Sequence, residues 1–284
     1  SARMGPSSRQ SPNTTLLLRE VWAAALLAAV YLGYSLYLDR PWDPALVDLI
    51  PARQIWYGIQ QNIRSYGATL TAFLVAVGLP RLLCCEAAYG TDALLRTSAR
   101  GCLTAWRDKV GFTLAYCAVV VGVIGAASLL CNAGAYGFRG ALLPVESSVY
   151  YGEEALPPHS NLGYCALQYL LLYLGSLYFA GFVLLLAALT GRPALTVVLC
   201  GLCHAAAMVY GYTGMPARGA ARALAEGLYR FGFGGYLLQD SFSWSWYRWP
   251  GLWTDLWKPV LLGLCLTAGG FALLWLVWRR RAKA

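Results

Sequence analysis

Cysteine and histidine side chains with the spacing of a cofactor site stand close together in one stretch of the chain. Cys200, Cys203 and His204 form a C-x-x-C-H pattern, which is the spacing used for covalent attachment of haem. Haem attachment needs an aqueous site, whereas this stretch lies inside a long apolar run, and no fourth metal ligand is evident. We therefore interpret Cys200 and Cys203 as small side chains within a helix. His204 is expected to make a hydrogen bond between helices or to belong to a transport pathway.

Acidic side chains form a second group, and this group lies in one polar stretch: Glu146, Glu153 and Glu154, with His159. Their spacing matches neither a metal site nor a pair of catalytic carboxylates, so we expect solvated side chains. The chain has only two histidines, and no serine–histidine–acid order is persuasive, which argues against a hydrolase. An intramembrane enzyme that processes lipid or peptide through Glu86, His204 or Glu153 remains an alternative, although the apolar runs hold almost no ionisable groups.

The third group is a charged segment between two apolar runs, Glu86–Lys109, which carries four basic and three acidic residues. Gly90 followed by Thr91 indicates a helix break and an N-cap. The threonine hydroxyl can accept a hydrogen bond from a backbone amide of the first helical turn, which has no partner within the helix. Leu94 and Leu95 then form a short apolar ridge. We expect a short helix across the cytoplasmic ends of two spans, where it docks a soluble ATP-hydrolysing partner. An ordinary cytoplasmic loop with positive charge is the alternative.

The remainder of the chain is too apolar for a soluble globule. Of its 284 residues, 58% are hydrophobic and 12% are charged, and the mean hydropathy is +0.52. Soluble domains carry roughly 25% charged residues. The composition therefore predicts an all-α polytopic membrane protein, with one transmembrane domain at 14–284 after a disordered cytoplasmic stretch at 1–13. The net charge of +9 does not indicate nucleic-acid binding, because the cations flank apolar runs instead of forming one basic face.

A membrane span needs about 20 apolar residues. Six runs qualify: Leu16–Leu38, Tyr66–Cys85, Val110–Leu130, Leu162–Leu189, Ala194–Tyr212 and Val260–Trp278. Pro80 predicts a kink in the second run or an early end to it. Before that run, Ala52–Ile63 is expected to form a short surface helix, with Trp42 and Trp56 as anchors at the membrane interface. An outer loop is expected at 132–161.

The expected outer stretch at 213–257 is unusually aromatic. Its candidate gate or substrate contacts are Trp244, Trp246, Tyr247, Trp249 and Trp253. Such side chains prefer the headgroup layer, which favours an interfacial or re-entrant hairpin. An outer gate that touches an amphipathic cargo is the alternative. Cys131 and Cys165 fall near the outer ends of two expected spans, where a disulfide is conceivable, but reduced thiols are the simpler interpretation.

The distribution of charge predicts the orientation in the membrane. With six spans, the termini, the segment 86–109 and the turn at Arg192 share one side. Counted with Arg19, Glu20 and Arg81, which lie near the ends of the first two spans on that side, it holds 13 Lys or Arg residues and four acidic residues, whereas the other side holds nine of each. Positive residues gather on the cytoplasmic side of membrane proteins. Both termini and the charged segment are therefore expected in the cytoplasm.

The order of residues in the segment 86–109 resembles that of the ABC-2-type permeases, the membrane subunits of ABC exporters. The shared pattern is an acidic residue, Gly-Thr, two leucines, Arg-Thr-Ser, Arg-Gly and a lysine that opens the next span. The matching positions are Glu86, Gly90, Thr91, Leu94, Leu95, Arg96, Thr97, Ser98, Arg100, Gly101 and Lys109. The wider plan of six spans with cytoplasmic termini is also similar. The chain departs from the family at Cys102, where a polar or basic residue is commoner, and in its aromatic outer stretch.

The resemblance implies that the segment is a coupling helix, which fits a groove on a nucleotide-binding ATPase subunit. The chain contains no G-x-x-x-x-G-K-[ST] phosphate-binding loop, so ATP and Mg are expected on that partner, and this chain binds no cofactor and is no enzyme. A second permease, identical or homologous, is implied because six spans make half a pathway. The expected setting is the lipid of a bacterial cytoplasmic membrane. The expected cargo is a hydrophobic or amphipathic peptide, lipid or drug. A non-catalytic scaffold that binds anionic lipid is the alternative.

Overall fold

Helices account for all the regular structure in the part of the chain that is described. This structure, a computed structural model, describes residues 52–63, 67–88, 101–144, 147, 160–213 and 257–283, with eight helical positions between Arg19 and Gly33. The helices are α3 (Ala52–Asn62), α4 (Ala68–Gly78), α5 (Pro80–Ala88), α7 (Gly101–Tyr136), α8 (Asn161–Thr190), α9 (Pro193–Thr213) and α12 (Trp257–Lys283). These ranges contain no β-strand, only an isolated bridge between Pro144 and Ser160. The predicted all-α class is confirmed for them.

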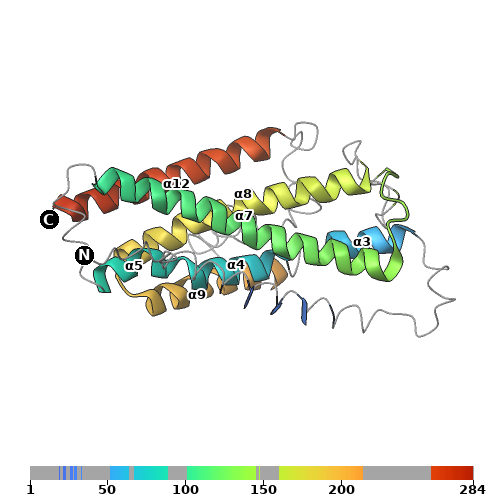
Figure 1. Cartoon of the computed structure of the whole chain (residues 1–284), viewed down its shortest axis with the longest axis horizontal. Helices are drawn as coiled ribbons and strands as arrows, with labels where there is room; N and C mark the ends of the chain where they lie inside the picture. The colour runs from blue at the N-terminus through green and yellow to red at the C-terminus, as the bar shows by residue number, and fades with distance from the viewer. Residues whose placement is uncertain are drawn as a thin grey trace, which may run out of the picture.

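Helix α8 lies at the centre of the bundle and contacts α3, α4, α5, α7, α9 and α12 (Figure 1). Ser160 caps its first turn, where its Oγ accepts a hydrogen bond of 3.2 Å from the amide of Gly163. Its last turn ends at Gly191, whose φ of 64° is left-handed and suits glycine. Helix α8 and residues 103–134 of α7 are each long and apolar enough to cross a membrane. Shorter apolar segments occur in α4–α5, α9 and α12.

Helix α7 is longer than the apolar run that predicted it. It begins at Gly101 and ends at Tyr136, whereas the expected span covered only Val110–Leu130. The expected outer loop at 132–161 is therefore too long, because residues 132–136 are helical. Backbone hydrogen bonds of a helix continue through polar residues, so the helix extends beyond the apolar run from which its length was predicted. The helix ends where Gly137 adopts a φ of 75°.

Pro80 interrupts the second expected span, as its position in the sequence predicts. Helix α4 ends at Gly78 and α5 begins at Pro80, with Leu79 in a turn between them. Proline has no amide hydrogen to donate to the carbonyl four residues earlier. The amide of Leu79 still bonds the carbonyl of Val75 at 3.2 Å, and the amide of Leu82 bonds the carbonyl of Leu79 at 3.0 Å. The two helices therefore remain connected by a short, hydrogen-bonded turn.

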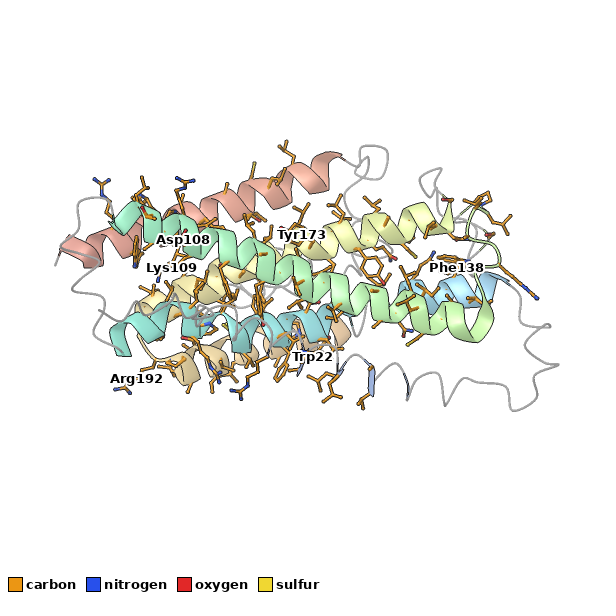
Figure 2. All side chains as sticks on the ribbon, viewed as in Figure 1. Trp22, Asp108, Lys109, Phe138, Tyr173 and Arg192 are labelled. Carbon is orange, nitrogen blue, oxygen red and sulfur yellow. The ribbon has the colours of Figure 1, made fainter. Side chains whose placement is uncertain are left out.

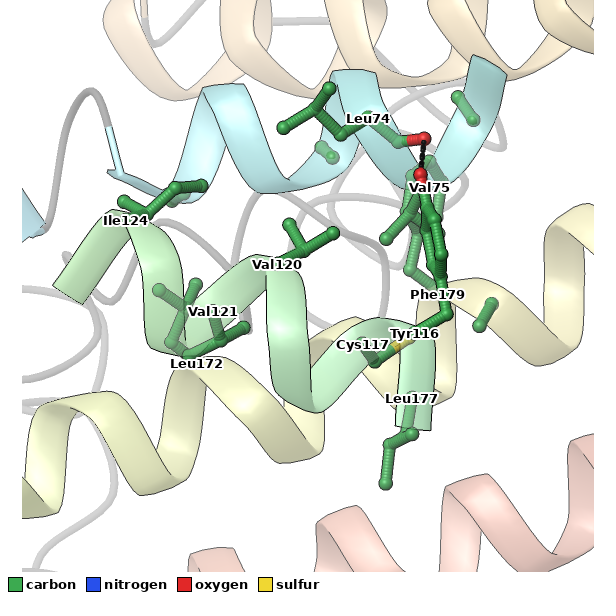
Figure 3. Close-up of a cluster of buried hydrophobic side chains, with 14 of the residues drawn as sticks. Leu74, Val75, Tyr116, Cys117, Val120, Val121, Ile124, Leu172, Leu177 and Phe179 are labelled. Carbon is green, nitrogen blue, oxygen red and sulfur yellow. Dashed lines mark hydrogen bonds between the residues drawn. The ribbon is translucent and has the colours of Figure 1, made fainter. Parts of the chain in front are cut away.

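The core between α4, α7 and α8 is apolar and closely packed (Figure 3). Tyr116 of α7 lies at its centre and donates a hydrogen bond of 2.9 Å from Oη to the carbonyl of Leu74. Its ring covers Gly78, so closely that a Cβ added there would stand 2.8 Å from Tyr116 Cζ. On the far side of α8, Gly181 faces the backbone of Gly270 in α12, where a Cβ at Gly181 would stand 3.8 Å from Gly270 Cα. Small residues let two helices approach in this way.

The exposed faces of the bundle are apolar, unlike the surface of a water-soluble protein, and its largely apolar interior includes some polar side chains. Its interior contains polar side chains, among them Thr71, Thr113, Gln168, Ser176 and Thr196. Its exposed faces carry large apolar side chains, among them Leu114, Leu130, Leu170, Leu202 and Leu264. Along α7 from Gly111 to Gly134, every exposed position is leucine, alanine or glycine. Lipid is the solvent that accommodates such a surface, while buried hydroxyls bond backbone carbonyls between and within helices.

At the opposite end of the bundle from α5, the short helix α3 packs near the end of α7 and the start of α8 (Figure 1). The expectation that Trp56 anchors α3 in the headgroup layer is wrong, because its side chain is only 1% exposed. Its Nε1 donates a hydrogen bond of 2.7 Å to the carbonyl of Arg139. Trp56 therefore attaches α3 to the turn that follows α7.

Replacing Trp56 by phenylalanine is expected to destabilise the protein by about 1 kcal/mol. The change removes the bond to Arg139 and keeps most of the aromatic packing, and a neutral hydrogen bond contributes about that much. Thermal unfolding in detergent should show a midpoint lowered by a few degrees. The matched control is Trp22→Phe, because Trp22 is 73% exposed and its replacement should leave the midpoint unchanged. Equal midpoints for both variants would contradict the structural role of Trp56.

Candidate functional site

The end of the bundle that holds α5, the start of α7 and the end of α12 is the candidate site, called the inner end below (Figure 1). It contains the two flanks of the predicted coupling segment. Glu86 lies in α5, and Lys109 lies in α7. The other predicted positions of this set lie outside the described residues: Gly90, Thr91, Leu94, Leu95, Arg96, Thr97, Ser98 and Arg100. Figure 2 shows Asp108, Lys109 and Arg192 at this end and Phe138 at the opposite end.

Lys109, which the resemblance predicts as a partner-binding residue at the end of the coupling segment, is buried. Its side chain is 6% exposed, and its Nζ donates to the carbonyl of Leu82 in α5 at 3.4 Å. The same ammonium lies 5.8 Å from the ring centroid of Trp278 in α12. A buried cation needs compensating partners, and a carbonyl oxygen and an aromatic face both provide them. Lys109 therefore connects α7 with α5 and with α12.

Aromatic side chains surround this lysine and form what we call the inner aromatic cluster: Trp106, Phe271, Trp275 and Trp278. The ring of Trp106 lies 6.4 Å from Phe271, 5.3 Å from Trp275 and 5.9 Å from Trp278. Trp106 and Lys109 stand three residues apart on α7 and so share a face of the helix. Three of the four cluster members lie on α12 at helical spacing, and sequence reasoning missed them as a group. The helical spacing of Phe271, Trp275 and Trp278 is the feature of the sequence from which the cluster could have been predicted.

Exposed positive charge surrounds the same end. The exposed cationic side chains are Arg81 of α5, Arg107 of α7, Arg192 before α9, and Arg279 of α12. Asp108 is the exposed acidic neighbour among the residues described here. A basic, partly aromatic surface attracts acidic groups of a protein or the phosphates of a lipid headgroup. The inner end therefore presents a net positive surface among the described residues.

The C-x-x-C-H pattern lies within α9, as the sequence predicts. Cys200 is buried, and within the described residues neither ring nitrogen of His204 has a hydrogen-bond partner. The expected interhelical bond of His204 is therefore not observed in this part of the chain. No three His, Cys, Asp or Glu side chains of the described residues lie close enough together to hold a metal ion. Cys131 and Cys165 are both free thiols.

The second candidate site of the sequence, the aromatic outer stretch, lies outside the described residues. This holds for each of its proposed contacts: Trp244, Trp246, Tyr247, Trp249 and Trp253. Comparison of the chain with protein-family models, with curated proteins and with solved structures finds no match.

Proposed function

We propose that this chain is the transmembrane permease subunit of an ATP-driven exporter of the ABC-2 type. In this proposal six helices cross a bacterial cytoplasmic membrane and both termini are cytoplasmic. Support for membrane residence comes from the two long apolar helices and from the large apolar side chains on the exposed faces of the bundle. Support for the orientation comes from the exposed arginines that gather at the inner end.

The contacts of Lys109 are the observation that carries the proposal. Helices α5 and α7 flank the segment that resembles a coupling helix, and the bond from Lys109 to Leu82 connects them directly. Trp106 and Lys109 also hold α7 against Trp278 of α12. A force applied to the segment from the cytoplasm therefore acts on α5, α7 and α12 together, which is the behaviour that a coupling element needs.

In the proposed mechanism, a separate nucleotide-binding subunit binds ATP and Mg and supplies the free energy of hydrolysis. Two such subunits approach each other and displace the coupling segments of two permease chains, identical or homologous. The inner end then moves as a unit, while the close contact of Gly181 with Gly270 keeps α8 packed against α12. The bundle alternates between inward-open and outward-open states around a hydrophobic or amphipathic cargo.

Charge reversal in the segment is expected to release the ATPase partner. The variant Arg96→Glu with Arg100→Glu should lower the ATPase activity that co-purifies with the tagged chain in mild detergent by about tenfold or more, since two interface arginines are lost. The truncation Leu94→Ala with Leu95→Ala should act in the same direction. The matched control is Arg192→Glu, which reverses an exposed charge at the same end but outside the segment.

Each outcome of this pull-down has a distinct meaning. Retention of the ATPase by the double charge reversal would remove the coupling mechanism. A chain that purifies without any ATPase would instead favour the non-catalytic scaffold, whose basic segment binds anionic lipid. Unfolding midpoints of all variants should match the wild type, because the exchanged side chains belong to a segment whose role is in binding a partner.

A further inference from the structure

The turn that follows α7, residues 137–144, is a rigid structure that we call the outer tip. Gly137 and Gly140 both adopt a φ of 75°, which glycine tolerates best. The amide of Gly137 bonds the carbonyl of Ala133 at 2.9 Å. Within the turn, the amide of Ala141 bonds the carbonyl of Phe138, and the amide of Leu143 bonds the carbonyl of Gly140, at 3.3 and 3.1 Å. The outer tip thus has its own hydrogen-bonded backbone.

Two neighbouring helices hold the outer tip in place. At the start of α8, the amides of Asn161 and Leu162 bond the carbonyls of Leu143 and Ala141 at 2.9 and 3.0 Å. The side-chain amide of Asn161 donates a further bond of 3.0 Å to the carbonyl of Gly140. From α3, Trp56 bonds the carbonyl of Arg139. Because these bonds take up its carbonyl groups, the outer tip presents side chains to its surroundings and few free backbone acceptors.

The side chains that the outer tip presents are apolar. Phe138 is 55% exposed, Leu142 is 84% exposed and Leu143 is 48% exposed. Turns at the surface of soluble proteins usually carry polar residues at such positions. Arg139, which is also exposed, places a positive charge beside them. Large apolar side chains next to a cation match the boundary between lipid acyl chains and phosphates.

The lengths of the two attached helices place the outer tip at this boundary. From Lys109 at the inner end to Tyr136, α7 advances about 41 Å at 1.5 Å per residue, and the 30 residues of α8 advance about 45 Å. A bilayer with both headgroup layers is about 40–45 Å thick. With the charged start of α7 in one headgroup layer, the outer tip therefore reaches the other.

The exposed surface leading to the outer tip supports lipid as its neighbour. Exposed leucines occur along α7 from Leu114, near the inner end, to Leu130, and along α8 from Leu170 to Leu162 in its first turn. No exposed charged side chain interrupts this surface on either helix before Arg139 is reached. A helix that left the bilayer for water would instead change to polar residues on its exposed side.

From these observations we infer that the outer tip is a lipid anchor. Phe138, Leu142 and Leu143 insert among the acyl chains just below the headgroups of the outer leaflet, and Arg139 lies at the level of the phosphates. The rigid backbone transmits this anchoring to α3, α7 and α8 together. The inference rests on the membrane residence in the proposed function, but it does not depend on the ATPase partner.

A single environment-sensitive probe at position 142 tests this inference in the full-length chain. Dansylalanine is encoded in place of Leu142, and the purified protein is reconstituted in phosphatidylcholine vesicles with a minor fraction of phosphatidylglycerol. Spin-labelled lipids with the nitroxide at the headgroup, at carbon 5 or at carbon 12 of the acyl chain act as depth-dependent quenchers, and iodide reports contact with water. Companion samples carry the probe in place of Gly122, an exposed position midway between Lys109 and Tyr136 on α7 where nothing lies within 4 Å of an added Cβ, or of exposed Arg192.

The expected result is blue-shifted emission at position 142, strongest quenching by headgroup and carbon-5 labels, and loss of the iodide quenching that position 192 shows. Iodide quenching at 142 equal to that at 192, without lipid quenching, would place the outer tip in water and overturn the inference. If neither spin-labelled lipid nor iodide quenched the probe at position 142, another protein surface would cover the outer tip. That result would also overturn the inference. Position 122 separates these failures from a failure of membrane residence, because carbon-12 lipid reaches the middle of α7 only when this helix spans the bilayer.

Discussion

Replacing Lys109 by glutamate is expected to cost about 3–5 kcal/mol, because the change leaves an uncompensated charge in a buried position. The wild-type ammonium faces the carbonyl of Leu82 and the ring of Trp278, and both present negative charge to it. A carboxylate at this position would be repelled by the two groups that stabilise lysine. The unfolding midpoint in detergent should fall by about 10 °C, given a few degrees per kcal/mol for a chain of this size.

Lys109→Met separates the structural role of this residue from its proposed role in coupling. Methionine fills a similar volume without a charge, and replacing a buried charge by an apolar side chain is often neutral or stabilising. The bundle should remain folded, while the bond between α7 and α5 is lost. In the exporter proposal, the co-purified ATPase should stay bound, and its activity should no longer respond to mutations or ligands of the permease.

The control for both variants is Arg107→Glu, a charge reversal two residues away on the exposed surface of α7. Exposed substitutions usually change stability by no more than about 0.5 kcal/mol. If Lys109→Glu and Arg107→Glu lowered the unfolding midpoint equally, the side chain of Lys109 would not be buried between α5 and α12. If Lys109→Met unfolded the protein, its contacts would be structural and would give no support to coupling.

A methyl group added at Gly78 is expected to destabilise the bundle by about 1–3 kcal/mol, the usual cost of overpacking a core. The new Cβ of Gly78→Ala would stand 2.8 Å from Tyr116 Cζ, so the ring must move. That movement would break the bond from Tyr116 Oη to the carbonyl of Leu74 (Figure 3). Thermal unfolding in detergent is the measurement, and a midpoint lowered by roughly 3–10 °C is expected.

Gly122→Ala provides the matched control, because no atom lies within 4 Å of the Cβ that would be added there. Alanine is favoured over glycine within a helix by about 1 kcal/mol, so this variant should be neutral or slightly stabilised. Combining Gly78→Ala with Tyr116→Leu removes the ring that the methyl group strikes and should recover part of the loss. A Gly78→Ala protein that unfolds like wild type would refute the packing of Tyr116 on Gly78.

The helical class and the break at Pro80 could be predicted because each depends on local chemistry. Runs of apolar residues identify helices that lipid can solvate, and proline interrupts a helix when it stands beyond the first turn. The ends of α7 could not be predicted in this way. Its helix continues outward to Tyr136 and begins at Gly101 before the apolar run, since helical hydrogen bonds depend on the backbone and not on hydropathy.

At the candidate site too, the sequence predicted the position of a residue along the chain but did not predict its contacts with distant segments. The sequence placed Lys109 at the end of a charged segment, but its burial depends on α5 and α12, which are far from it in the chain. Trp56 was predicted at the membrane interface because tryptophan prefers that layer, yet the turn after α7 covers it. The preference of a residue type is an average, and a specific partner overrides it.

By itself, the sequence determined that this chain is helical and largely apolar and that its cations gather beside its apolar runs. These properties follow from the residue types and their order, and they do not depend on contacts between distant parts of the chain. Only the tertiary structure decided that α8 is central, that Tyr116 packs on Gly78 and that Lys109 joins three helices. Those contacts depend on the shapes of surfaces from distant segments, and close packing allows few ways to fit them together.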